Sequence, residues 1–150
     1  MNTRDLRLAQ LDQALAPWHA HAEAPPAEGW LRAIRMALGI STRQAAQRAG
    51  VSQSSWMDAE RREAAGTISL GQLRRLGAAL DCRLTHALVP DLPLREKVDA
   101  RAEQRAVAEV NAVAHSMALE QQRADDAYTR LQVTQRKQEL LRGRWSRLWD

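Results

Sequence analysis

The residues whose types and spacing suggest chemistry follow a glycine near the middle of the chain. Gly50 suits a tight turn, Val51 is an apolar residue that can plug a core, and Ser52 can cap a helix. Gln53 comes next, and its amide can pair bidentately with an adenine edge in the DNA major groove. A turn, an apolar plug and a capped helix are what a DNA-reading helix-turn-helix needs, in this order. Double-stranded DNA is therefore the first partner that we expect.

The elements that must position this helix are expected to be α-helices, which makes the fold class all-α. Ser41 with Gln44 and Ser69 with Gln72 have the spacing of capping boxes, and no segment has the alternation of a strand. We expect five helices in the middle region: 30–38, one between Ser41 and Gly50, one from Ser52 to before Gly66, one from Ser69 through Leu80, and a short one at 84–88.

Further helices are expected on both sides of this region. A short N-terminal helix at 3–16 precedes a proline-containing linker, and a long helix over 94–123 precedes a helical tail over 124–150. The long helix has an apolar stripe that needs a partner surface, formed by Val98, Ala102, Ala106, Val110, Val113 and Met117. The expected boundaries are 1–27 for the N-terminal helix and linker, 28–90 for the five-helix domain, and 91–150 for a partner-binding or dimerisation extension.

The positive charge of the chain is concentrated in the middle region. The formal net charge is +4, and residues 30–90 hold nine arginines against four acids. Residues 1–29 hold two arginines against four acids, and residues 91–150 hold eleven bases against ten acids. Because arginine suits bidentate phosphate contacts, the excess lies where DNA contacts are expected.

The sequence indicates no catalytic, metal or cofactor site. Cys82 follows an apolar helix and is expected in the core, and His19 and His21 have no third metal ligand beside them. No spacing suggests nucleophilic catalysis, so we expect that the protein is not an enzyme and binds no cofactor. No apolar run could span a bilayer and the first residues lack a signal-peptide core, so we expect a cytoplasmic protein without membrane contact.

Residues 30–90 resemble the XRE, or Cro/repressor-like, family of helix-turn-helix domains in their caps, glycines and core positions. The resemblance implies that Trp56 and Ala59 face the core and that Arg35 of the first helix pairs with Glu60 of the recognition helix. One short helix covers only a half-site, so a homodimer is expected on DNA. The expected DNA-binding residues are Thr42, Arg43, Ser52, Gln53, Ser54, Met57, Asp58, Arg61 and Arg62.

These residues divide into base readers and phosphate contacts. Gln53 is the strongest candidate base reader. Phosphate contacts are expected from Thr42, Arg43 and the loop at 61–69, where side chains and helix N-termini meet the DNA backbone. Asp58 departs from this pattern, because a carboxylate repels phosphate unless it accepts from a cytosine amino group. We interpret Asp58 as a filter against wrong sequences.

The whole chain is similar to a narrower family, called mobile mystery protein A, whose members occur beside a Fic-domain protein on mobile elements. The matching stretches are GWLRAIRMALGISTRQAAQRAGVSQSS, EAAGTISLGQLRRLGAALDCRLTHALVP, VAHSMALEQQ and SRLWD. The resemblance implies a regulator that represses its own operon. It also implies an antitoxin that binds and inhibits a Fic enzyme, which transfers AMP from ATP.

The stretch SMALEQ at 116–121 gains meaning from this resemblance. Fic inhibitors resemble one another in a helix that carries Ser or Thr, then three residues, Glu, and Gly or Asn. Ser116 and Glu120 match this pattern one helical turn apart, whereas Gln121 departs from it. The resemblance implies that the Glu120 carboxylate binds an arginine that would otherwise hold the ATP γ-phosphate.

Two simpler interpretations stay open. The middle domain could have lost DNA binding and serve only to dimerise. Alternatively, the chain could be a plain homodimeric repressor whose extension only dimerises, with Glu120 a solvated side chain. The second interpretation differs from a Fic-binding antitoxin in whether the apolar stripe of the long helix is covered within the homodimer or by another protein.

Overall fold

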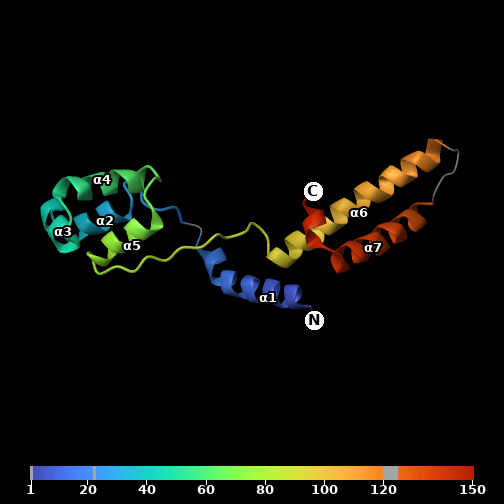
Figure 1. The fold of residues 1–150 in the computed structure, drawn as a ribbon, viewed down its shortest axis with the longest axis horizontal. Coiled ribbons are helices and arrows are strands. Elements are labelled where there is room, and N and C mark those ends of the chain that lie inside the picture. The colour runs from blue at the N-terminus through green and yellow to red at the C-terminus, as the bar shows by residue number, and fades with distance from the viewer. Residues whose placement is uncertain (1, 22, 120–124) are drawn as a thin grey trace. The chain divides into compact units, whose positions relative to one another are not determined.

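Helices account for all regular secondary structure in the part of the chain that the structure describes. The computed structural model describes residues 2–21, 23–119 and 125–150 (Figure 1). No strand occurs in these ranges, so the predicted all-α class is confirmed for them. The elements, with η for 3-10 helices, are α1 (Thr3–Leu15), η1 (Ala16–Ala20), α2 (Trp30–Ala37), α3 (Thr42–Ala49), α4 (Gln53–Ala64), α5 (Leu70–Ala78), α6 (Leu94–Leu119), α7 (Asp126–Arg142) and η2 (Trp145–Leu148).

The chain divides into two compact units. One unit is Ala20–Leu88 and contains α2 to α5; we call it the α2–α5 unit. The other combines the chain up to His19 with Val89–Asp150, and we call it the α1/α6/α7 unit. Within the described ranges, no helix is both long and apolar enough to cross a bilayer.

The core of the α2–α5 unit is built around the indole of Trp56. Trp56 and Leu76 are fully buried, and α3 lies against α4. Small side chains line the contact between these helices, because Ala45, Ala46 and Ala59 are all buried. Their small volume lets the two helices approach closely around one large ring.

The predicted helix starts of this unit are confirmed. The Ser41–Gln44 capping box has both hydrogen bonds, from the Gln44 N–H to the Ser41 hydroxyl and from the Ser41 N–H to the Gln44 side chain. Ser52 caps α4 through one bond, since its hydroxyl accepts from the Ser55 N–H at 3.1 Å, and Ser69 caps α5 likewise by accepting from the Gln72 N–H. Gly50 ends α3 with a φ of +68°, a left-handed conformation that favours glycine.

The short helix predicted at 84–88 is wrong. Residues 82–90 have no regular secondary structure, and Leu88 is 94% exposed. Five residues form too few backbone hydrogen bonds to offset the cost of starting a helix, and Pro90 disfavours helical backbone at Val89. The α2–α5 unit therefore has four α-helices instead of five in its described residues.

In the α1/α6/α7 unit, α6 and α7 lie side by side and the N-terminal helix α1 lies against α6 (Figure 1). The Asp12 carboxylate of α1 accepts from the backbone N–H groups of Leu94, at 2.6 Å, and Arg95, at 3.1 Å. These groups are at the start of α6, so α1 supplies the N-terminal cap of a helix that begins 82 residues later. The N-terminal helix thus belongs to the same compact unit as the C-terminal helices.

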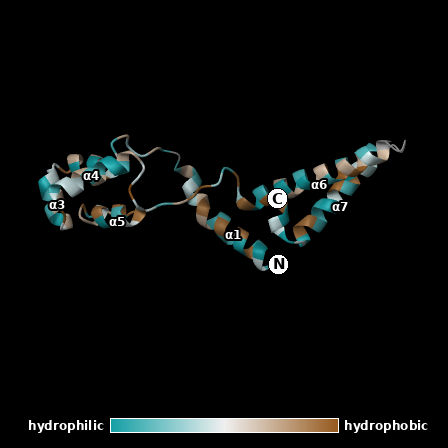
Figure 2. Ribbon diagram, turned by 45° about the horizontal axis from the view of Figure 1, so that its top comes forward, coloured by the Kyte–Doolittle hydropathy of each residue, from teal (hydrophilic) through white to brown (hydrophobic). Residues whose placement is uncertain are grey.

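The apolar stripe of α6 is buried over its first part only. Ala102, Ala106 and Val110 are buried, whereas Val113 and Met117 are 58% and 39% exposed. Figure 2 shows hydrophobic and hydrophilic bands alternating along α6 and α7, as expected for helices that are apolar on one side. The apolar stripe is therefore covered within this unit from Ala102 to Val110, and it is exposed at Val113 and Met117.

Ion pairs join α6 to α7 beside the stripe. The Arg136 guanidinium donates to the Glu109 carboxylate, and this contact lowers the pKa of Glu109 below its ordinary value. Lys137 pairs with Asp99 at 2.7 Å and with Glu103 at 2.8 Å, and the hydrogen bond to Asp99 contributes most to raising the pKa of Lys137. Such partly exposed pairs add little stability each, so we assign them to fixing the register of the two helices.

The end of the tail is packed within this unit, since Leu148 is fully buried. The Arg101 guanidinium of α6 donates to the Leu148 carbonyl and lies 5.9 Å from the centre of the Trp149 ring. The last turn of the chain is therefore held against α6 by apolar burial, a hydrogen bond and a cation–π contact.

The cap from Asp12 predicts how α1 is held. Replacing Asp12 with Ala leaves two N–H groups at the start of α6 without this acceptor, and we expect the free energy of unfolding to fall by about 1 kcal/mol. Urea denaturation of the full chain measures this loss, and faster amide exchange in α1 would accompany it. Asp5→Ala is the matched control, because it removes the same charge from α1 but only an ion pair with Arg95 at 3.7 Å. Equal effects of the two substitutions would contradict the capping role.

Candidate nucleic-acid interface

The helix α4 has one face in the core and one face in solvent. Trp56, Ala59 and Glu60 are buried, as the sequence predicts for the first two. On the other side, Gln53, Ser54 and Met57 are exposed, and the Asp58 side chain is 49% exposed. The side chains predicted to face a DNA groove are therefore accessible on one surface of α4, which we call the outer face.

A buried carboxylate fixes this orientation. The Arg35 guanidinium of α2 donates to both Glu60 oxygens, at 2.5 and 3.1 Å, so the predicted pair is confirmed. The Trp56 indole N–H also donates to Glu60, at 2.6 Å, and Arg35 donates to the Ile40 carbonyl at 3.0 Å. One cluster thus joins α2, the turn before α3, and α4.

A second contact between α2 and α4 was missed by sequence reasoning. The Glu63 carboxylate accepts from the backbone N–H groups of Trp30, at 2.6 Å, and Leu31, at 2.9 Å. Glu63 thus caps α2 from α4. Gly29 leaves room for this carboxylate, because a Cβ added there would lie 2.9 Å from the Glu63 carboxyl carbon. The signal in the sequence is the absence of a Ser, Thr, Asp or Asn before Trp30, because a helix without a local cap needs a distant one.

The starts of α3 and α4 meet at two of the predicted DNA-binding residues. The Gln53 amide N–H donates to the Thr42 hydroxyl at 2.8 Å. Arg43, in the first turn of α3, is exposed. Ser52 is engaged in capping, and its hydroxyl also lies 2.8 Å from that of Ser55. The structure thus brings Thr42 and Gln53 together and uses Ser52 for the helix start.

Asp58 has partners that the sequence analysis did not assign to it. Its carboxylate accepts from the Arg62 Nε at 2.8 Å and from an Arg61 terminal nitrogen at 3.4 Å. The two arginines predicted to contact phosphate are therefore paired within α4. Their spacing of three and four residues from Asp58 was the available signal, since such residues are neighbours on a helix surface.

A hollow of about 360 Å³ lies beside the Arg35–Glu60 pair. Arg32, Thr42 and Arg61 line it, together with the side chain of Met57. Arg32 is exposed and contributes a further positive charge next to the start of α3, a position that sequence reasoning did not single out. The hollow thus combines two arginines outside the buried pair with the N-terminal end of a helix, features that favour an anionic group, although Glu28 also lines it and offsets part of this positive charge.

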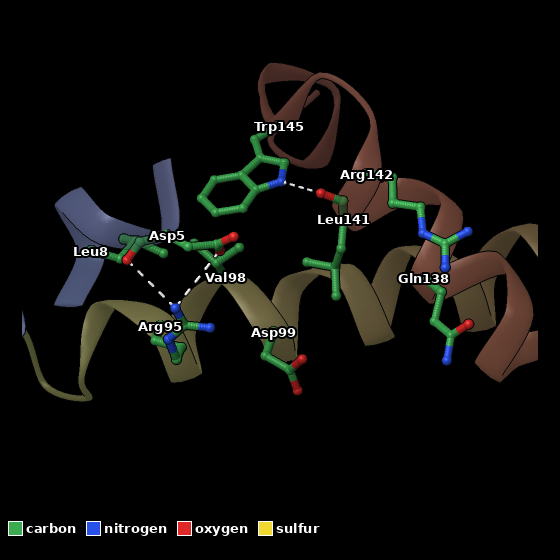
Figure 3. Close-up of a pocket in the computed structure, with 9 residues that line it drawn as sticks. All are labelled: Asp5, Leu8, Arg95, Val98, Asp99, Gln138, Leu141, Arg142 and Trp145. Carbon is green, nitrogen blue, oxygen red and sulfur yellow. Dashed lines mark hydrogen bonds and ion pairs between the residues drawn. The ribbon is translucent and has the colours of Figure 1, made fainter. Parts of the chain in front are cut away.

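The α1/α6/α7 unit has a hollow of about 310 Å³ between its helices (Figure 3). The Trp145 indole borders it, and its N–H donates to the Leu141 carbonyl at 2.8 Å. Arg95 and Asp5 line the hollow as an ion pair, and Asp99 is paired with Lys137. Because Asp5, Arg95, Asp99 and Trp145 already have partners within this unit, we interpret the hollow as a packing gap where α1, α6 and α7 meet.

The residues predicted to inhibit a partner are described only in part. Ser116 is exposed on α6, and its hydroxyl donates to the Ala112 carbonyl at 3.2 Å. Glu120 and Gln121 lie outside the described residues. Among the residues that the structure describes, no three His, Cys, Asp or Glu side chains are grouped to hold a metal ion.

Comparison with known proteins adds no assignment to this geometry. No family model, no curated protein and no solved structure matches this chain.

The Glu60 cluster predicts a large stability effect. Glu60→Ala leaves the buried guanidinium of Arg35 and the indole N–H of Trp56 without their acceptor, so we expect the free energy of unfolding to fall by about 3–5 kcal/mol. Glu60→Gln keeps one acceptor and should lie between wild type and Glu60→Ala. Denaturation followed by tryptophan fluorescence measures all three proteins.

Asp81→Ala is the control for this series. Asp81 forms an ion pair with Arg48 at 2.9 Å in the same unit, but both side chains are exposed. Only a small loss is expected, because water screens the exposed pair and the remaining cost is that of alanine in the left-handed backbone at Asp81, whose φ is +58°. A loss in Asp81→Ala as large as that in Glu60→Ala would refute the role that we assign to Glu60.

Proposed function

We propose that this chain is a sequence-specific DNA-binding regulator of the helix-turn-helix type, with α4 as its recognition helix. One observation carries the proposal. The helix α3 ends at a left-handed Gly50, Ser52 caps α4 two residues later, and Trp56 anchors the inner face of α4. The outer face then presents the Gln53 amide at the start of the helix, where a recognition helix contacts base edges.

The charges around α4 support backbone contacts. Arg43 is exposed in the first turn of α3, where backbone N–H groups and the helix dipole also favour an anion. Arg32 and Arg61 line the neighbouring hollow. Together they offer positive charge near α4, where contacts to the DNA backbone would position the recognition helix.

The length of α4 indicates the form of the DNA site and the number of protein copies that bind it. A helix of twelve residues covers one half-site, so we propose that two copies bind an inverted repeat. The resemblance to mobile mystery protein A supports a site in the chain's own operon and hence autorepression. Domain boundaries at 28 and 90 for the DNA-binding part, within an XRE-type fold, belong to this proposal.

Substitutions on the two sets of residues should have different effects. Gln53→Ala should relax the base preference at one position of the site, with a loss of about 1–3 kcal/mol for the preferred base. Arg43→Ala should weaken binding to all sequences alike and make the salt dependence less steep by about one unit. Fluorescence anisotropy on duplexes selected from a random pool, and on scrambled duplexes, measures both. A Gln53→Ala protein that loses equal affinity for both duplexes would contradict the recognition role.

The exposed end of the apolar stripe on α6 favours a second role, the binding of a protein partner. Val113 and Met117 are exposed where the stripe continues, and Tyr128 and Leu131 of α7 are also exposed. Exposed apolar side chains along a helix pair are suited to a protein partner. We propose that this partner is a Fic-domain AMP-transferase, which the chain inhibits as an antitoxin through Ser116 and Glu120. The alternative occupant is a second copy, as in a plain homodimeric repressor.

Co-purification with the Fic protein separates these two occupants, and Glu120→Gly tests inhibition by the carboxylate. We expect the substituted chain still to co-purify with the Fic protein encoded beside it, because apolar contacts hold the complex. Self-modification of the Fic protein should return, since a charge-assisted contact of about 1.5–3 kcal/mol to its arginine is lost. Ser116→Ala should give a weaker release.

Two results would contradict the inhibitory role. A wild-type chain that does not co-purify with the Fic protein would favour the homodimeric repressor. A Glu120→Gly complex as inactive as the wild-type complex would exclude inhibition by this carboxylate.

A further inference from the structure

The ion pairs of Asp58 lie in the middle of the outer face of α4. At about 100° per residue, Ser54, Asp58 and Arg61 project opposite to the buried residues of the helix. The Asp58 carboxylate therefore occupies the part of α4 that would enter a groove most deeply. It also holds Arg61 and Arg62, at 3.4 and 2.8 Å.

We propose that Asp58 is an internal competitor of DNA phosphate and thereby determines the sequence specificity of the chain. This inference rests on the proposed DNA-binding function and adds a mechanism to it. A carboxylate and a phosphate bind an arginine through the same kind of charge-assisted hydrogen bond. Asp58 engages one N–H of Arg61 and one of Arg62, so a DNA phosphate must share each guanidinium with this carboxylate or displace it.

The cost of displacing the carboxylate depends on the DNA sequence. At a site that presents a cytosine amino group to α4, the carboxylate exchanges its arginines for a new donor, and the arginines are released to phosphates. At other sites the carboxylate keeps its charge without a donor, near the phosphates of the groove. The same side chain therefore favours one sequence and weakens binding to the rest, which is how specificity arises as a difference of affinities.

The size of the effect is set by the exposure of the pairs. Arg61 is 70% exposed and Arg62 is 38% exposed, so water screens both contacts. An exposed pair of this kind changes an equilibrium by up to about fivefold. We therefore expect a shift in the ratio between specific and random binding, and no change of fold.

The experiment uses Asp58→Asn in the full chain, with Asp81→Asn as the matched control. Asp81 also pairs with an arginine, Arg48, at 2.9 Å, but it lies outside α4. Both substitutions remove one negative charge from the same unit. The probes are a duplex selected from a random pool by the wild-type chain and a scrambled duplex of the same composition.

For Asp58→Asn we expect binding to the scrambled duplex to strengthen about fivefold. Its salt dependence should steepen by about one unit, because a released arginine adds a phosphate contact. Binding to the selected duplex should strengthen less, so the ratio of the two affinities falls. Asp81→Asn should leave that ratio unchanged.

A second background separates competition from simple repulsion. When Arg61 and Arg62 are both replaced by Gln, Asp58→Asn has no arginine to release, and the gain on scrambled DNA should vanish. A gain that persists in this background would show repulsion between carboxylate and phosphate alone and would overturn the proposal.

Two further outcomes are distinguishable. If Asp58→Asn and Asp81→Asn have equal effects while the wild-type chain selects a defined sequence, the role of Asp58 fails and the DNA-binding function stands. If the wild-type chain selects no sequence and binds no duplex, the DNA-binding function fails and the role of Asp58 fails with it.

Discussion

The geometry of the α2–α5 unit depends on the buried carboxylate of Glu60. A charge in a protein core is strongly unfavourable unless hydrogen bonds and an opposite charge compensate it. Here the guanidinium of Arg35 and the indole N–H of Trp56 supply both. Alanine contacts between α3 and α4 would by themselves tolerate a rotation or a shift of α4, because methyl groups are too small to interlock with the neighbouring helix. The Glu60 carboxylate does not tolerate such a movement, since it would lose its hydrogen bonds to Arg35. The identity of the outer face of α4 is therefore fixed by a polar contact on its inner face.

Carboxylates from distant parts of the chain also organise the helix starts. Glu63 caps α2 from α4, and Asp12 caps α6 from α1. Each cap satisfies backbone N–H groups that carry the positive end of the helix dipole. A local serine cap fixes only where a helix begins, as Ser41 and Ser52 do. A distant carboxylate fixes, in addition, which helix lies beside that beginning. In this way Asp12 joins α1 to the C-terminal helices although the α2–α5 unit separates them in sequence.

The features that could be predicted from the sequence are mainly those that depend on interactions between residues close together in the chain. Capping residues and glycines act within four residues, and the starts of α3, α4 and α5 could be predicted from them. The pairing of Arg35 with Glu60 could be predicted only through a family resemblance, because no local rule joins two helices. The caps from Asp12 and Glu63 could not be assigned, since a missing local cap before Trp30 shows that a distant acceptor is needed but does not show which residue supplies it. The helix predicted at 84–88 was wrong because helical spacing of two leucines does not offset the cost of starting so short a helix before Pro90, and Leu88 remains exposed. The ion pairs of Asp58 with Arg61 and Arg62 could have been predicted from their spacing of three and four residues.

The outer face of α4 is not a set of free hydrogen-bonding groups. The Gln53 amide already donates to Thr42, and Asp58 already binds Arg61 and Arg62. A polar ligand that takes the donor or acceptor already engaged in these pairs must replace contacts that exist in the free protein, so its affinity is the difference between new and old hydrogen bonds. A ligand that matches only part of the pattern leaves an amide or a carboxylate without its former partner. Discrimination by such a surface comes from the contacts that a wrong ligand fails to restore, and it can be large even where the net affinity is modest.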